Sequence, residues 1–122
     1  MTPNQKKLHN AITLTRDWPA KGVVFKDLIP MMSDPNLVAL CIDELIKATK
    51  HLKYDTILAA ESRGFWFSIP MAYKLKKWWV PCRKKGKLPG KTIEQSFKLE
   101  YGTATREIQK GAIKKGDKLL IL

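Results

Sequence analysis

The stretch Tyr54-Asp55-Thr56-Ile57-Leu58-Ala59-Ala60-Glu61-Ser62-Arg63-Gly64 decides the fold. Its first seven residues are nearly continuously apolar, which is typical of a strand buried on both faces of a parallel sheet. The last four form a corner, and a helix-like stretch from Phe65 through Lys76 follows. Backbone N–H groups at a helix N-terminus, beside a glycine that permits close approach, suit a phosphate or pyrophosphate. A strand–turn–helix corner with a surface arginine would look the same, so this corner alone leaves both interpretations open.

Strand and helix patterns alternate on both sides of this corner. Upstream, helices are expected to start at Thr2-Pro3, with an apolar face that reaches Ile12, and at Ser33-Asp34-Pro35, and a short β-prone run lies at Val23-Val24-Phe25. Downstream, the expected elements are the strands 78–82, 92–99 and 118–122 and, at 111–116, a turn with a short helix. This alternation predicts an α/β fold with a mostly parallel sheet.

Composition indicates one globular domain over residues 1–122. The chain is 44% hydrophobic and 28% charged, which permits a packed core. It has no apolar run long enough to cross a bilayer and no secretory signal, so a cytoplasmic protein without membrane association is expected. Cys41 and Cys82 each lie apart from any cysteine or histidine cluster. Two buried, reduced thiols are therefore expected, with neither a disulfide nor a metal site.

The formal net charge of +12 favours an anionic partner: nucleic acid, an anionic membrane or a phosphorylated small molecule. Most of the lysines are scattered, as on a solvated surface. The densest cluster, Arg83, Lys84, Lys85 and Lys87, lies on a glycine-containing loop after a strand. Arginine supplies paired donors to a phosphate and lysine a point charge. The same patch could contact nucleic acid, or nothing.

Four blocks, taken in order, resemble the successive motifs of adenine phosphoribosyltransferases. They are 22–27 (Gly-Val-Val-Phe-Lys-Asp), 61–65 (Glu-Ser-Arg-Gly-Phe), 83–90 (Arg-Lys-Lys-Gly-Lys-Leu-Pro-Gly) and 99–102 (Leu-Glu-Tyr-Gly). The resemblance implies a type I phosphoribosyltransferase fold: a parallel sheet flanked by helices, with a small N-terminal hood at about residues 17–32. It also implies purine salvage in a homodimer. Ribose 5-phosphate would pass from phosphoribosyl pyrophosphate to N9 of adenine, giving AMP and pyrophosphate, with Mg²⁺ assisting.

The resemblance assigns roles near the adenine. Val24 and Lys26 would hold the base through backbone contacts, and Phe25 would pack on its ring. Glu100 and Tyr101 match a mobile flap that closes over the reactants. A carboxylate and a phenol at a strand end can handle a proton at a substrate nitrogen, and Glu100 is the candidate. Taken alone, the same pair also fits a strand end with a solvated glutamate.

The resemblance also assigns the pyrophosphate ligands. They come from two segments: Glu61, Ser62, Arg63 and Gly64, and the basic residues Arg83, Lys84 and Lys87. Family members often hold a cis peptide bond at the position of Glu61-Ser62. In family dimers, the arginine matched by Arg83 can reach the neighbouring subunit's site.

One family motif has no counterpart. After a strand like 118–122, these enzymes continue with two adjacent acidic residues and a Thr/Gly-rich loop that wraps the 5-phosphate of the donor. The last strand and helix of the family fold are missing as well. The sequence therefore predicts a truncated product, a fragment or a gene broken by an early stop, with impaired or absent catalysis.

Two other functions stay open. The first is a basic nucleic-acid-binding protein that uses the 83–87 loop with Trp78 and Trp79. It is disfavoured because the tryptophans lie in a strand-like run, where packing in the core or at an interface is expected of them and of Trp66. The second is a non-catalytic partner of a full-length paralogue.

Overall fold

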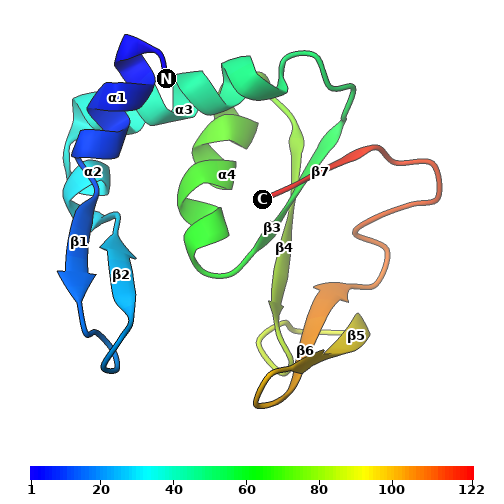
Figure 1. Cartoon of the computed structure of the whole chain (residues 1–122). Helices are drawn as coiled ribbons and strands as arrows, with labels where there is room; N and C mark the ends of the chain where they lie inside the picture. The colour runs from blue at the N-terminus through cyan, green and yellow to red at the C-terminus, as the bar shows by residue number, and fades with distance from the viewer. The chain divides into compact units, whose positions relative to one another are not determined.

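The computed structural model describes residues 1–122 and divides into two compact units, Met1–His51 and Leu52–Leu122. The first unit contains α1 (Pro3–Asn10), β1 (Thr13–Arg16), β2 (Val24–Asp27), α2 (Ile29–Ser33) and α3 (Pro35–Thr49). The second contains β3 (Thr56–Ala60), α4 (Arg63–Leu75), β4 (Trp78–Lys84), β5 (Thr92–Leu99), β6 (Gly102–Gln109) and β7 (Leu119–Ile121) (Figure 1). None of the helices combines the length and apolar character needed to span a membrane.

Capping side chains fix the helix starts in the first unit, as the sequence predicted. The Thr2 hydroxyl accepts a hydrogen bond from the Gln5 amide, and the Gln5 side chain accepts one from the Thr2 amide, which together form a capping box. The Asp34 carboxylate accepts hydrogen bonds from two amides in the first turn of α3, and Pro35 fills the first helical position. The short helix α2, which has no side-chain cap, was not predicted.

The predicted β-prone run forms one strand of a hairpin in the first unit. β2 pairs antiparallel with β1, from Thr13 opposite Asp27 to Arg16 opposite Val24. The sequence predicted that the apolar face of the first helix reaches Ile12, but α1 ends at Asn10. The chain then enters β1, whose β-branched threonines pair with β2. Between the two strands, Trp18 packs edge-on against Phe25, with ring centroids 4.5 Å apart.

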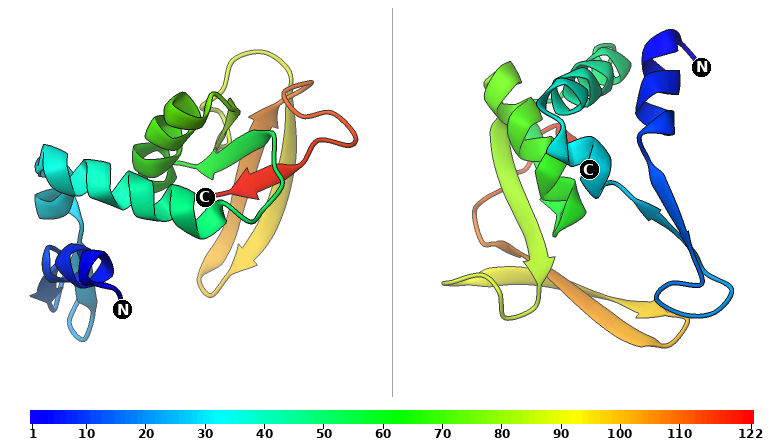
Figure 2. Two further views of the ribbon diagram at one scale, coloured as in Figure 1. Left: turned by 90° about the horizontal axis from the view of Figure 1, so that it is seen from above. Right: turned by 90° about the vertical axis from the view of Figure 1, so that its left-hand side faces the viewer.

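The second unit is built on a five-stranded sheet in the order β5-β6-β4-β3-β7. The predicted parallel pairing is confirmed in its centre, where β3 runs parallel to both β4 and β7. Antiparallel pairing joins β6 to β4 and to β5, so the edge of the sheet is a hairpin, which extends from the carboxyl end of β4 (Figure 2). The strand β6 was not predicted.

The core of the second unit lies where α4 packs against β3 and β4. Ile57 and Ala59 of β3 and Met71 of α4 are completely buried, and Val80 of β4 is nearly so. This confirms the predicted burial of β3. The corner after Ala60 therefore connects two elements that the core holds firmly.

The connection between β6 and β7 differs from the prediction. The expected short helix at 111–116 is absent, and the segment consists of turns. Gly111 and Gly116 both have positive φ, at 85° and 97°, which a right-handed helix does not allow. The Asp117 carboxylate accepts a hydrogen bond from the Lys114 amide and closes one of these turns.

The three tryptophans for which packing was predicted differ in their exposure. Trp79 is half-buried, packs edge-on against Phe65 at 5.1 Å and donates a hydrogen bond to Ser68 Oγ at 2.9 Å, so its predicted packing role is confirmed. Trp78 is 78% exposed and Trp66 is 37% exposed. The expectation of core packing is therefore wrong for Trp78, and an interface role for it stays a prediction.

Both cysteines are free, as predicted, but neither is fully buried. Cys41 and Cys82 lie at intermediate exposure, because each is on an element that is covered only in part. Partial burial raises the pKa of both thiols above the ordinary value. Both thiols are therefore protonated at neutral pH.

Candidate anion-binding site

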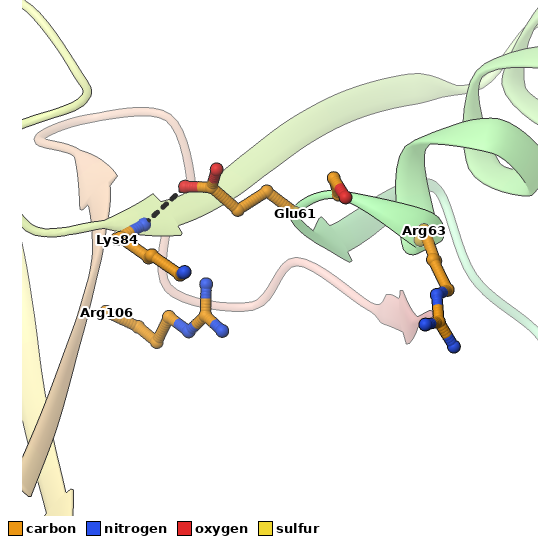
Figure 3. A pocket seen from close by; sticks show the side chains of 6 residues that line it. Glu61, Arg63, Lys84 and Arg106 are labelled. Carbon is orange, nitrogen blue, oxygen red and sulfur yellow. Dashed lines mark hydrogen bonds between the residues drawn. The ribbon is translucent and has the colours of Figure 1, made fainter. Parts of the chain in front are cut away.

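A pocket of about 370 Å³ lies at the carboxyl ends of β3 and β4, where open α/β sheets bind their ligands. Its lining comes from the corner before α4 and from two neighbouring strands: Glu61, Ser62, Arg63, Gly64, Lys84 and Arg106. Figure 3 shows Lys84 and Arg106 on one side of the pocket and Arg63 on the other, with Glu61 between them. The structure thus joins the predicted corner to one residue of the predicted basic cluster.

The corner itself has the predicted form of strand, turn and helix. β3 ends at Ala60, α4 begins at Arg63, and the peptide bond between Glu61 and Ser62 is cis, as the family resemblance implied. A side chain on Gly64 would not fit, because its Cβ would lie 2.9 Å from the backbone oxygen of Leu122. Gly64 therefore lets the corner lie close to Leu122, the residue after β7, and the close approach to a phosphate that was expected of it stays a prediction.

Glu61 ties the corner to the end of β4. Its Oε1 accepts a hydrogen bond from the Lys84 amide at 2.6 Å and lies 3.4 Å from Arg83 Nε. The hydrogen bond from the Lys84 amide is the largest cause that lowers the pKa of Glu61, and the nearby Arg83 and Arg106 lower it further. The carboxylate is thus ionised at neutral pH and neutralises part of the surrounding positive charge.

The predicted basic cluster divides into residues with different surroundings. Only Lys84 lines the pocket. Arg83 lies beside Glu61, and its Nη1 donates a hydrogen bond to the Lys87 carbonyl oxygen at 2.9 Å. Lys85 forms an ion pair with Glu94 at 3.0 Å, and the Lys87 side chain is exposed outside the pocket lining. Arg83 and Lys85 therefore shape the loop through these contacts.

Glu107 is a buried carboxylate that the sequence analysis missed. It is 4% exposed, and its Oε1 accepts hydrogen bonds from the amides of Gly86 and Leu88 at 3.0 and 3.3 Å. Its Oε2 accepts one from the Thr92 hydroxyl at 3.1 Å. The loop after β4 is therefore held by a side chain of β6. Burial along β6 does not alternate with period two, so no local pattern pointed to an inward-facing residue here.

Arg106 is a second missed residue and the only pocket-lining side chain from β6. It lies directly opposite Lys84 in the antiparallel pairing of β4 and β6. Its Nη1 atom is buried and has no hydrogen-bond partner in the protein.

The other predicted site residues lie outside this pocket's lining. Glu100 and Tyr101 form the two-residue turn between β5 and β6, where Leu99 pairs with Gly102. Both are exposed, Tyr101 to 92%. The three residues assigned to adenine, Val24, Phe25 and Lys26, are consecutive on β2 in the first unit, with Phe25 half-buried and its neighbours exposed.

The chain is similar to known adenine phosphoribosyltransferases, although no protein-family model matches it. It is 48% identical over 106 residues to the one from Kosmotoga olearia, which covers 87% of this chain. It is 46% identical over 117 residues to the one from Malacoplasma penetrans, which covers 96%. The chain spans 62% and 68% of the length of these two relatives.

Solved structures show the same likeness. The crystal structure of the Thermoanaerobacter pseudethanolicus adenine phosphoribosyltransferase superposes with a TM-score of 0.91 at 40% identity, over 95% of this chain and 67% of that one. The Saccharomyces cerevisiae enzyme, complexed with an imino-altritol bisphosphate and adenine, gives a TM-score of 0.90 at 35% identity, over 99% of this chain and 71% of that one. The fold described above is therefore the fold of these enzymes over the matched residues.

Proposed function

We propose that this chain, which belongs to the adenine phosphoribosyltransferase family, supplies the adenine and pyrophosphate sites of a purine-salvage reaction. In that reaction ribose 5-phosphate moves from phosphoribosyl pyrophosphate to adenine, giving AMP and pyrophosphate. The observation that carries the proposal is the pocket at the carboxyl ends of β3 and β4, which Arg63 and Lys84 line from opposite sides. The yeast relative, solved with adenine bound, supports adenine as the base.

The pocket residues have a clear task in this reaction. The bond between the ribose C1 and a pyrophosphate oxygen breaks, and its electron pair leaves with the pyrophosphate. Preorganised cations that face this developing charge stabilise the transition state. Arg63 offers paired donors and Lys84 a point charge, while Glu61 holds the end of β4 against the corner through its hydrogen bond with the Lys84 amide. Ser62 and Gly64 would bring the backbone of the corner close to the phosphate oxygens.

The remaining assigned residues complete the proposal. Val24 and Lys26 would bind adenine through their backbone and Phe25 through its ring. Adenine loses the N9 proton as N9 bonds to the ribose, and Glu100 is the proposed group that handles it, with Tyr101 in the same flap. A two-residue hairpin turn with both side chains exposed is suited to a segment that moves over a ligand. Arg83 and Lys87 are proposed as further pyrophosphate ligands.

We propose that Mg²⁺ reaches the site bound to the donor, phosphoribosyl pyrophosphate. No group of three or more His, Cys, Asp or Glu side chains in the structure could hold a metal ion, and the Oε1 atom of Glu61, the pocket's carboxylate, already accepts a hydrogen bond from the Lys84 amide. The side chains alone thus do not form a metal site, which fits an ion that arrives on the phosphate oxygens. When bound there, Mg²⁺ would neutralise part of the leaving group's charge.

Three other assignments, made from composition and from the family resemblance, stay predictions. Residues 1–122 are assigned to one phosphoribosyltransferase domain with a hood at about 17–32. A homodimer and a cytoplasmic location are expected. The nucleic-acid alternative is not favoured, because Trp79 is engaged with Phe65 and Ser68 and the similar proteins are adenine phosphoribosyltransferases.

Binding and turnover measured side by side test the proposal. Calorimetric titrations of phosphoribosyl pyrophosphate and of adenine into chain 1–122 are expected to show binding, and Arg63→Ala is expected to weaken only the former, by about tenfold or more. Conversion of adenine to AMP is expected to be slow, since no segment of these residues places paired acids before a Thr/Gly loop. Salt-sensitive retention on DNA or RNA without binding of either substrate would contradict the proposal.

A further inference from the structure

We propose that Arg106 is a ligand of the donor's pyrophosphate and forms, with Arg63 and Lys84, a three-cation site. This inference rests on the proposed function of the pocket and adds a residue outside the four sequence blocks that carry the family resemblance. Its ligand class is a multiply charged phosphate, either free pyrophosphate or the pyrophosphate group of phosphoribosyl pyrophosphate.

The sheet register brings Arg106 to the pocket. Arg106 pairs with Lys84 across β4 and β6, and both side chains line the pocket. Figure 3 shows the guanidinium of Arg106 beside the amino end of Lys84. Two cations placed side by side repel each other unless an anion lies between or above them. This arrangement therefore favours an anionic ligand.

The carboxylates of the surrounding elements are already engaged. Glu61 Oε1 accepts a hydrogen bond from the Lys84 amide and lies beside Arg83. Glu107, the next residue on β6, uses both oxygens to hold the loop after β4. The buried Nη1 of Arg106 has no hydrogen-bond partner in the protein. Arg106 forms none of the ion pairs with these carboxylates, so an anionic ligand in the pocket that Arg106 lines is the counter-charge that the arrangement calls for.

The number and spread of the cations favour pyrophosphate over a single phosphate. Arg63 enters the pocket from the start of α4, whereas Lys84 and Arg106 enter from two strands. The guanidinium groups each offer paired donors, so the site presents more donors than one phosphate group can use. A pyrophosphate has enough oxygens and charge to engage both sides of the pocket at once.

A purely structural role for Arg106 makes a different prediction. Its positive charge contributes to the low pKa of Glu61, so Arg106 could act only as a counter-charge for that carboxylate. In that case, replacing Arg106 would lower the stability of the free protein and leave the affinity for pyrophosphate unchanged. The two roles are therefore separable by measuring stability and affinity on the same variants.

The test is a calorimetric titration of inorganic pyrophosphate, and separately of inorganic phosphate, into chain 1–122 and three variants. Arg106→Met keeps the apolar stem and removes the charge, whereas Arg106→Lys keeps the charge and removes the paired donors. Lys115→Met is the matched control, because it removes one charge from an exposed lysine outside the pocket. Thermal unfolding without ligand is measured for each variant.

Arg106→Met is expected to weaken pyrophosphate binding about tenfold, and Arg106→Lys by less. Lys115→Met is expected to bind like the parent chain, and phosphate is expected to be less sensitive to Arg106 than pyrophosphate. Unchanged pyrophosphate affinity in Arg106→Met overturns this inference but leaves the proposed function standing. If Arg106→Met does not fold, the pyrophosphate affinity of Arg106→Lys is used instead, and an unchanged affinity in that variant overturns the inference.

The outcomes also separate this inference from the proposed function. If the parent chain binds no pyrophosphate, the inference and the proposed pyrophosphate site fail together. If pyrophosphate binds in an Arg106-dependent manner but the chain binds no adenine, the inference stands and the proposed adenine site fails.

Discussion

The Glu61 carboxylate accepts a 2.6 Å hydrogen bond from the backbone amide of Lys84 and so joins the corner after β3 to the last residue of β4. This bond links two segments that are 23 residues apart in the chain. It fixes the position of a pocket cation through its backbone and leaves the Lys84 side chain available to a ligand. The negative charge of Glu61 is thus used to build the pocket, whose other charged lining residues are cations.

Glu61→Gln is expected to change how stability depends on pH. The folded protein lowers the pKa of Glu61 below its ordinary value of 4.5, chiefly through the Lys84 amide. The ionised carboxylate is therefore favoured by folding, and its contribution is complete above that ordinary pKa. It is lost as the pH falls through the lower folded pKa. Melting temperatures of both proteins should differ at neutral pH and converge in acid. A constant difference from pH 7 down to about pH 3 would contradict this account.

Glu107→Ala is expected to loosen the loop after β4. The change leaves the amides of Gly86 and Leu88 and the hydroxyl of Thr92 without their acceptor. A loss of about 1–3 kcal/mol in unfolding free energy is expected, together with faster hydrogen exchange at those two amides. Glu94→Ala is the control, because it removes only the exposed ion pair with Lys85 and should cost at most about 1 kcal/mol. Equal effects of the two substitutions would show that Glu107 does not hold the loop.

Gly64→Ala is expected to disturb the contact between the corner and the end of the chain. The added Cβ would lie 2.9 Å from the carbonyl oxygen of Leu122, which is backbone and cannot move aside without shifting β7. Overpacking of this kind costs about 1–3 kcal/mol of stability. Ser62→Ala is a suitable control, since the exposed Ser62 side chain makes no capping hydrogen bond to α4 and its loss should change stability by less than about 0.5 kcal/mol. An unfolding free energy for Gly64→Ala equal to that of the parent chain would refute the close approach.

The sequence sufficed for the parts of the structure that local patterns specify. The burial of β3, the cap at Asp34 and the corner at 61–64 each follow from residues close together in the chain, and the structure confirms them. The antiparallel pairing of β6 with β4 joins residues more than 20 apart, and no local pattern of 102–109 predicted it. That pairing places Arg106 and Glu107, so both were missed.

Local sequence patterns also did not show which side chains are exposed, as the two adjacent tryptophans of β4 illustrate. Trp78 and Trp79 alternate across β4, so only Trp79 faces α4, where its ring packs against Phe65 and its Nε1 donates to Ser68 Oγ. Trp79→Phe is expected to cost about 1–3 kcal/mol, because Ser68 is completely buried and would lose this partner. Trp78→Phe, at a position that is 78% exposed, should change stability by less than about 0.5 kcal/mol. Urea unfolding of both variants measures the difference. A larger loss for Trp78→Phe would mean that Trp78 is covered in solution, as in the interface role predicted for it.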